Sequence, residues 1–227
     1  MDIILILLII FIPIIAQIGI KSAYSNNSRI ENDLKITGKD VARKILDKNG
    51  LQNIDIVCIN GELTDHYDPR KKRVSLSTNI YNGTSISSAA VAAHEVGHAI
   101  QDKKGYFYLR LRSFLVPIVN ITSHISTIFI FIGFTIEALD IVNIGIYLLL
   151  VGLLFQLITL PVEFNASSRA KVQLKECGLL SDENTSGTNS VLNAAALTYV
   201  AGFLAQALQI FRLILISRDN NKWLSLF

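Results

Sequence analysis

Cysteine is scarce in this chain of 227 residues, because Cys58 and Cys177 are the only two. Neither stands in a C-x-x-C or similar metal-ligand spacing, and both fall in segments for which we expect a reducing compartment. The sequence therefore argues against a disulfide and offers no cysteine zinc site. Nothing around the two thiols indicates thiol catalysis.

Charged side chains are absent from three long apolar stretches, 3–20, 114–136 and 141–160, which run 18, 23 and 20 residues. At about 1.5 Å per residue each can cross a hydrocarbon core of about 30 Å, the first only just. A fourth apolar stretch, 194–216, is interrupted only by Arg212. It can span the membrane, lie at the interface or pack over a site. The sequence thus predicts a mainly α membrane protein with three to four transmembrane helices.

The head of the first stretch has no basic side chain, since it consists of Met1 and Asp2. The apolar run is longer than a usual signal core, and no small-x-small cleavage site follows it. We therefore expect residues 1–20 to be an uncleaved anchor. Pro13 inside it is compatible with a membrane helix.

Basic residues give the orientation, because 15 of the 21 Lys and Arg lie between Lys21 and Arg112. The turn between the second and third stretches holds only two charged residues, Glu137 and Asp140. The positive-inside rule therefore places the part over 21–113 in the cytoplasm, and the segment over 161–190 returns there after a transmembrane hairpin over 114–160. Membrane flanks explain the net charge of +3, so no nucleic-acid partner is needed.

The part over 21–113 has the patterns of a small α/β domain. A capping sequence at Thr37 and a stop at Gly50 frame a helix over 41–49, and Asn60-Gly61 is a turn signal. Further expected elements are strands over 54–59 and 73–77 and a helix from Thr84 or Ser85 to about Gly105.

The motif with the clearest chemistry is His94-Glu95-Val96-Gly97-His98, an H-E-x-x-H within that last expected helix. Residues four apart share a helical face, so both imidazoles can reach one ion while Glu95 projects beside them. This is the arrangement of a zinc peptidase, in which the carboxylate takes a proton from water. The alternative is a helix that merely carries two histidines and an acid.

Catalytic zinc usually takes three protein ligands, so one is still to be found. A metzincin would supply a histidine six residues after His98, but that position is Lys104, and Gln101 stands where its glycine should be. We expect the third ligand to be Glu163, at the cytoplasmic end of the third stretch, where Pro161 marks a kink or a fresh helix start. The alternative is an interfacial charge that ends a membrane helix.

Several segments together resemble the YugP-like zinc metallopeptidases of bacterial membranes. They cover nearly the whole chain and are His94–Gln101, Leu63–Pro69, Leu160–Ser167 and Leu192–Val200. The resemblance implies a multi-pass protein of the bacterial plasma membrane that binds Zn²⁺ and hydrolyses peptide bonds.

The architecture is also similar to HtpX-like membrane peptidases, whose zinc site faces the cytoplasm. Their downstream ligand lies in E-x-x-A-D, and here Glu163 and Ala166 match whereas Ser167 replaces the aspartate. Because an outer carboxylate would orient a zinc histidine, another group must do so here.

These observations predict a gluzincin-like zinc endopeptidase with metal ligands His94, His98 and Glu163 and general base Glu95. Its expected substrates are proteins or peptides, with membrane proteins first by analogy with HtpX-like enzymes. Candidate oxyanion donors are His66, Tyr67 and Tyr199, and the strand over 73–77 can be an edge that pairs with substrate.

Two other classes remain open. One is a non-catalytic zinc-binding membrane protein, against which Glu95 argues. The other is a site-2-type intramembrane protease, against which the absence of Asp from the three clear stretches and the short 15-residue helical run 86–100 both argue. His124 lies inside the second stretch, and we expect it to be a neutral histidine hydrogen-bonded between helices.

The sequence also divides the chain into five parts, which we expect to be the anchor over 1–20, the cytoplasmic part over 21–113, the hairpin over 114–160, the ligand-bearing segment over 161–190 and a C-terminal apolar helix over 191–227.

Overall fold

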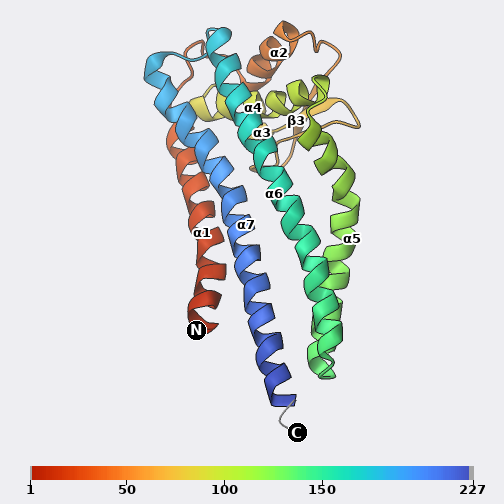
Figure 1. The fold of residues 1–227 in the computed structure, drawn as a ribbon. Helices are drawn as coiled ribbons and strands as arrows, with labels where there is room; N and C mark the ends of the chain where they lie inside the picture. The colour runs from red at the N-terminus through yellow and green to blue at the C-terminus, as the bar shows by residue number, and fades with distance from the viewer. Residues whose placement is uncertain (1, 225–227) are drawn as a thin grey trace. The chain divides into compact units, whose positions relative to one another are not determined.

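The computed structural model describes residues 2–224, which form seven helices and one three-stranded sheet (Figure 1). In chain order the elements are α1 (Asp2–Asn27), α2 (Gly38–Lys48), β1 (Asp55–Ile59), β2 (His66–Asp68), β3 (Arg73–Ser77), α3 (Thr78–Asn82), α4 (Ile86–Lys103), α5 (Phe107–Thr135), α6 (Leu139–Glu176) and α7 (Asp182–Leu224). They form two compact units. The helical unit comprises residues 1–16, 111–160 and 199–227, and the mixed unit comprises residues 17–110 and 161–198.

Four helices in the described part of the chain are long and apolar enough to cross a membrane. They run over Ile3–Asn27, Phe107–Thr135, Leu139–Glu176 and Glu183–Arg218. Each extends beyond the apolar stretch read from the sequence, because helical hydrogen bonding continues into the polar flanks. The fold is therefore that of a mainly α membrane protein with a small α/β domain, as predicted.

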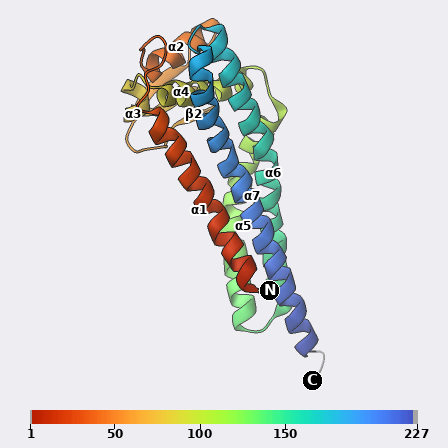
Figure 2. The same cartoon turned by 90° about the vertical axis from the view of Figure 1, so that its left-hand side faces the viewer.

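Within the helical unit, α5 and α6 form an antiparallel hairpin through a short turn, as both views show (Figures 1 and 2). The Ser126 hydroxyl donates to the Gly145 carbonyl at 3.0 Å, which ties the two helices together. The close approach depends on Gly145, because a Cβ there would lie 2.5 Å from an Ile130 side-chain carbon. A small residue at the contact is typical of helix pairs in membranes.

The outer surface of the helical unit is strongly apolar. Ile3 and Phe131 are each 73% exposed, which in a membrane means contact with lipid rather than with water. His124 is also exposed on α5. The structure therefore does not bear out our expectation of a histidine hydrogen-bonded between helices, because the side chain lies on the exposed surface of α5.

The mixed unit is built on a sheet with the strand order β1-β3-β2. Strand β3 pairs in parallel with β1 and antiparallel with β2, so it is the central strand. Our expectation that residues 73–77 form an edge is therefore wrong, because the sequence analysis did not foresee the three-residue strand β2. The buried side chains of Val74 and Leu76 attach β3 to the core.

Helix α4 is the central helix of the mixed unit and packs along α2 (Figure 1). Most of its residues are buried, and the alanines at 89, 90, 92 and 93 allow close packing while favouring the helix. Helix α2 begins at a capping box formed by Thr37 and Asp40 and is followed by Gly50 with φ +64°. Helix α4 begins after the N-cap Ser85. Both starts lie where the sequence predicts them.

Helix α6 is continuous from Leu139 to Glu176 and contains Pro161. Of the two alternatives that the sequence left open at Pro161, a kink or a fresh helix start, the fresh start is therefore wrong. The residues from Pro161 onward belong to the mixed unit, so the proline stands where α6 passes from one unit into the other. Glu163 thus sits in the middle of a helix and not in a first turn.

Candidate metal centre

Helix α4 places His94 and His98 on one face, four residues apart. Their ring centroids lie 4.8 Å apart in an edge-to-face arrangement. His98 is buried and His94 is half-buried, so both rings are held by the protein rather than by water. The helix supplies this spacing directly, since residues i and i+4 lie one above the other.

Helix α6 brings Glu163 to the two histidines. Its Oε2 atom lies 3.2 Å from Nε2 of His94 and 3.6 Å from Nε2 of His98. Glu163 is only 1% exposed, so the carboxylate is aimed into the protein rather than at solvent. The residue that lies 65 positions beyond His98 in the sequence therefore meets both Nε2 atoms.

The approach of α6 to α4 depends on the residue between the histidines. A Cβ on Gly97 would lie 2.6 Å from the backbone oxygen of Ala166, which is closer than atoms can pack. The two backbones therefore touch at Gly97 and Ala166. This contact places Glu163, one turn earlier on α6, beside the histidines.

The three side chains fit a zinc ion in distance and in chemistry. Their ligand atoms all lie within 4.8 Å of one another. Ligands about 2.0–2.1 Å from a tetrahedral zinc lie about 3.4 Å from each other, between the 3.2 and 3.6 Å separations found here. Two imidazoles and one carboxylate form the donor set of a catalytic site and leave a fourth position open.

Glu95 is buried beside this group, at 8% exposure. Burial raises the pKa of Glu95 to about 7, and the charges of Glu163 and Asp65 act in the same direction, whereas His94 and the Tyr67 backbone N–H lower it. A carboxyl with a pKa near neutrality is well matched to taking up and releasing a proton at physiological pH. Glu95 is thus a buried carboxyl with a raised pKa beside the two histidines.

Each histidine has a hydrogen-bond partner at its other ring nitrogen. Nδ1 of His94 lies 3.2 Å from the Ser167 hydroxyl, and Nδ1 of His98 lies 3.0 Å from Oε1 of Gln101. The serine that replaces the expected aspartate therefore contacts His94, one of the two histidines of the candidate site. Gln101 was not among the residues that sequence analysis assigned to the site, although its position three residues after His98 puts it on the same helical face.

Strand β2 is joined to the end of α4 by a polar cluster. The Tyr67 hydroxyl donates to Asp102 at 2.7 Å, and Lys72 pairs with the same carboxylate at 2.6 Å. Burial and the bond to Asp102 raise the pKa of Tyr67. Because its hydroxyl is committed to Asp102, the structure does not favour Tyr67 as the oxyanion donor.

The other two candidate oxyanion donors differ in position. His66 is exposed, and its Nδ1 lies 2.9 Å from the Thr64 carbonyl oxygen. Tyr199 is exposed on α7 and belongs to the helical unit. The described contact of His66 is therefore with a loop carbonyl and not with Glu163 or the two histidines.

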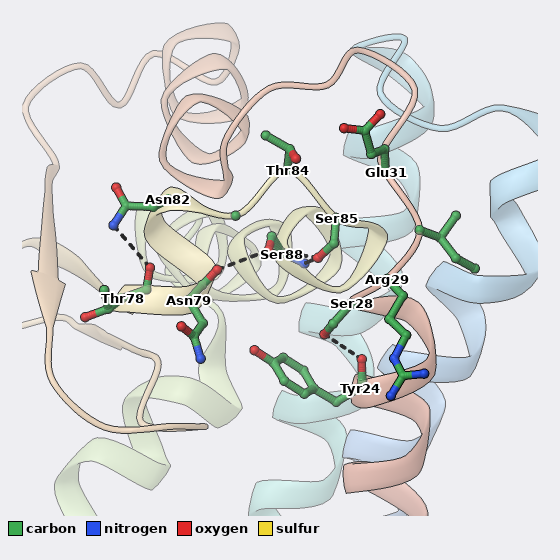
Figure 3. Close-up of a pocket in the computed structure, with 12 residues that line it drawn as sticks. Tyr24, Ser28, Arg29, Glu31, Thr78, Asn79, Asn82, Thr84, Ser85 and Ser88 are labelled. Carbon is green, nitrogen blue, oxygen red and sulfur yellow. Dashed lines mark hydrogen bonds between the residues drawn. The ribbon is translucent and has the colours of Figure 1, made fainter.

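A separate polar cavity of about 500 Å³ lies at the N-terminal end of α4 (Figure 3). It is lined by the end of α1, by α3 and by the start of α4, including Tyr24, Asn79 and Ser88. Ser88 lies six residues before His94, about 9 Å along the helix axis. None of the three metal-site residues lines it, so the cavity is distinct from the candidate metal centre.

The helices and this group of side chains define a class of protein, a membrane protein with a metallopeptidase-type site. The chain matches the family described as "Putative neutral zinc metallopeptidase" over residues 2–218, and it belongs to that family. It is also 43% identical over 209 residues to "Putative membrane protease YugP" of Bacillus subtilis (strain 168), a match that covers 91% of this chain and 93% of that protein. No solved structure matches the chain.

Proposed function

We propose that the protein is a membrane-bound zinc endopeptidase in which His94, His98 and Glu163 hold the metal and Glu95 is the general base. The observation that carries the proposal is the meeting of the three ligand side chains beside a buried fourth, Glu95. A purely structural zinc site has no need of such a base. Family membership supports zinc as the metal.

Zinc in this site would supply Lewis-acid chemistry, making water acidic near neutral pH and polarising a peptide carbonyl. The residues of the chain do the rest. A carboxylate oxygen of Glu95 accepts the proton of the attacking water and then delivers it to the leaving amine.

The outer edge of β2 is the proposed position for an extended substrate. The backbone N–H of Tyr67 donates a hydrogen bond to the Glu95 carboxyl and lowers its pKa, so this part of β2 lies beside the proposed base. Strand β2 is at the edge of the sheet, where a peptide can add as a further strand through main-chain hydrogen bonds. Pairing with an extended substrate, which the sequence suggested for the strand over 73–77, is thus proposed for β2.

We further propose that the site faces the cytoplasm and acts on membrane proteins or their cytoplasmic tails. The thiol of Cys58 provides a test of the orientation, because it is exposed on β1 within the mixed unit. In a Cys177→Ser background, a membrane-impermeant maleimide should label Cys58 only after the cells are lysed. Labelling in intact cells would place the mixed unit outside.

The proteolytic mechanism is tested by Glu95→Gln, which keeps the shape and removes the base. Loss of a general base typically costs about 10²–10⁴-fold in rate, while zinc should still bind. Wild type and variant are produced at equal levels in bacterial membranes, and new protein N-termini are compared by proteomics. Glu62→Gln is the control, because Glu62 is an exposed acid of the mixed unit.

The possible outcomes separate the remaining classes of function. Fragments that appear with wild type and Glu62→Gln but not with Glu95→Gln support the endopeptidase. Equal fragments with Glu95→Gln would reject Glu95 as the base. Stoichiometric zinc without any fragment in the wild type would favour a non-catalytic zinc-binding membrane protein.

A further inference from the structure

The side chain of Gln101 is fully buried and makes polar contacts at both ends of its amide. At one end Oε1 lies 3.0 Å from Nδ1 of His98. At the other end Nε2 lies 2.8 Å from the backbone oxygen of Val162 and 3.0 Å from Oδ1 of Asn165, both on α6. One side chain on α4 thus connects a metal-site histidine to the part of α6 that carries Glu163.

The chemistry of its partners determines which way the Gln101 amide points. The Val162 carbonyl can only accept a hydrogen bond, so the group facing it must be the amide NH₂. Arg169 gives an independent indication, because its Nε can only donate and it lies 2.8 Å from Oδ1 of Asn165. That atom of Asn165 is therefore an oxygen, and it too requires a donor from Gln101.

The orientation of Gln101 in turn determines the proton position on His98. With its NH₂ facing α6, Gln101 presents Oε1 to the imidazole, and an amide oxygen can only accept. Nδ1 of His98 must therefore carry a proton. The neutral ring then has its lone pair on Nε2, the nitrogen that lies 3.6 Å from Oε2 of Glu163.

His94 has a different kind of partner. The Ser167 hydroxyl at its Nδ1 can donate or accept by rotation, so it is compatible with either tautomer of the ring. At Nδ1, the ring nitrogen that does not face Glu163, only His98 of the two histidines has a partner of fixed polarity among the described residues. His94 thus has Ser167 in place of the expected aspartate, whereas His98 has the amide of Gln101, whose orientation is determined by its contacts with α6.

We propose that Gln101 is a positioning residue that holds His98 in the tautomer able to bind metal and links it to α6 through Val162. The proposal rests on the proposed metal site, in which Nε2 of His98 is the ligand atom. Gln101 itself does not touch the metal or the substrate. It acts by selecting one tautomer and one ring orientation before a metal arrives.

The first test uses the metal-free wild-type protein, purified as the full chain in detergent. Its four histidines give a simple ¹⁵N spectrum, and His98→Asn identifies the signals of His98. We expect the neutral ring of His98 to carry its proton on Nδ1. A neutral His98 protonated at Nε2 alone would overturn the proposal without the use of any Gln101 variant.

The second test measures zinc affinity by competition with a chelator of known affinity. Gln101→Leu should weaken binding about 10–100-fold, the usual effect of removing an outer partner of a metal ligand. Ser87→Ala is the control, because Ser87 is equally buried on α4 but donates to the Tyr24 carbonyl. Ser167→Ala should weaken zinc less than Gln101→Leu does.

Equal zinc affinity in wild type and Gln101→Leu would overturn the proposal, as would equal losses in Gln101→Leu and Ser87→Ala. If the wild type binds no zinc, the proposed metal site fails instead. The ¹⁵N result on the metal-free protein still decides the tautomer in that case. The two failures are therefore distinguishable.

Discussion

The helical unit and the mixed unit are stabilised in different ways. The helical unit exposes large apolar side chains such as Ile3 and Phe131, as expected for contact with lipid, and its acids Glu137 and Asp140 are exposed. The mixed unit instead buries Glu95, Gln101 and Glu163. Length and apolarity suffice for the first unit, whereas the second requires particular atoms at particular places.

Two helical glycines, one in each unit, show the same difference between the units. A Cβ on Gly97 would lie 2.6 Å from a backbone oxygen on α6, whereas a Cβ on Gly202, in the helical unit, would meet Gln156 at an ordinary 3.7 Å. The first glycine is required by the close contact of α4 with α6, and the second glycine has no such contact. Substitutions in the helical unit should therefore change stability, while substitutions at the α4–α6 contact should change the site.

The largest difference between the two units should be in zinc affinity, when a carboxylate is removed from the part of α6 that lies in each unit. Glu163→Ala removes one of three proposed ligands, so zinc affinity should fall by more than the 10–100-fold typical of an outer partner. Asp140→Ala removes an exposed acid from the same helix and should leave zinc unchanged. Chelator competition measures both, and full zinc occupancy in Glu163→Ala would refute the ligand set.

The second difference concerns the two glycines. Gly97→Ala should destabilise the protein by about 1–3 kcal/mol, because the new methyl group forces α6 away from α4. Gly202→Ala should be neutral or stabilising by up to about 1 kcal/mol, since alanine is the better helix former. Thermal unfolding in detergent gives the two values.

Zinc binding provides the readout that is specific to the site. Gly97→Ala should also lower zinc affinity, because it separates Glu163 from the histidines. Wild-type zinc affinity in Gly97→Ala would show that the contact with Ala166 is not needed to bring the ligands together.

The sequence predicted the helical architecture well because long apolar stretches are decided by composition. It also identified the H-E-x-x-H helix, a start at Thr84 or Ser85, of which Ser85 is the cap, and the side chain of Glu163, which the structure brings to both histidines. The spacing of four residues and the return of the chain through a hairpin are both readable from a single sequence.

The parts that the sequence did not predict depend on tertiary contacts. Strand β2 has three residues and forms only because β3 offers it an edge. Helix α6 continues through Pro161, where the sequence left open a kink or a fresh helix start. The pairing of Gln101 with His98 had a weak signal, the i+3 spacing, but its choice of partner depends on Val162, 61 residues away.

The third expected difference is in pH dependence, because the mixed unit buries acids and the helical unit exposes them. Burial raises the pKa of Asp65, although hydrogen bonds from Ser77 oppose the shift. The folded pKa lies above the unfolded value, so the stabilising contribution is complete below the unfolded pKa and is lost as pH rises through the folded pKa. Metal-free protein should therefore lose the stabilising contribution of Asp65 as pH rises from about 4 toward neutrality.

Asp65→Asn should reduce this loss, since asparagine can keep both contacts with Ser77 but does not ionise. The raised pKa of Glu95 contributes in the same direction and remains in the variant, so the slope should become smaller without vanishing. Urea unfolding at a series of pH values in the presence of a chelator measures it. An unchanged slope would show that Asp65 does not contribute.

The smallest expected effect lies in the helical unit, where polar side chains join α6 to α7. Gln206 donates to the Leu149 carbonyl at 3.0 Å and also pairs with Gln156. Replacing both glutamines with leucine should cost about 0.6 kcal/mol per lost bond, the average for such bonds in membranes. Unfolding in detergent measures this cost, and zinc affinity should stay at the wild-type value. A change in zinc affinity would mean that the polar pair influences the metal site and that the two units are not energetically separate.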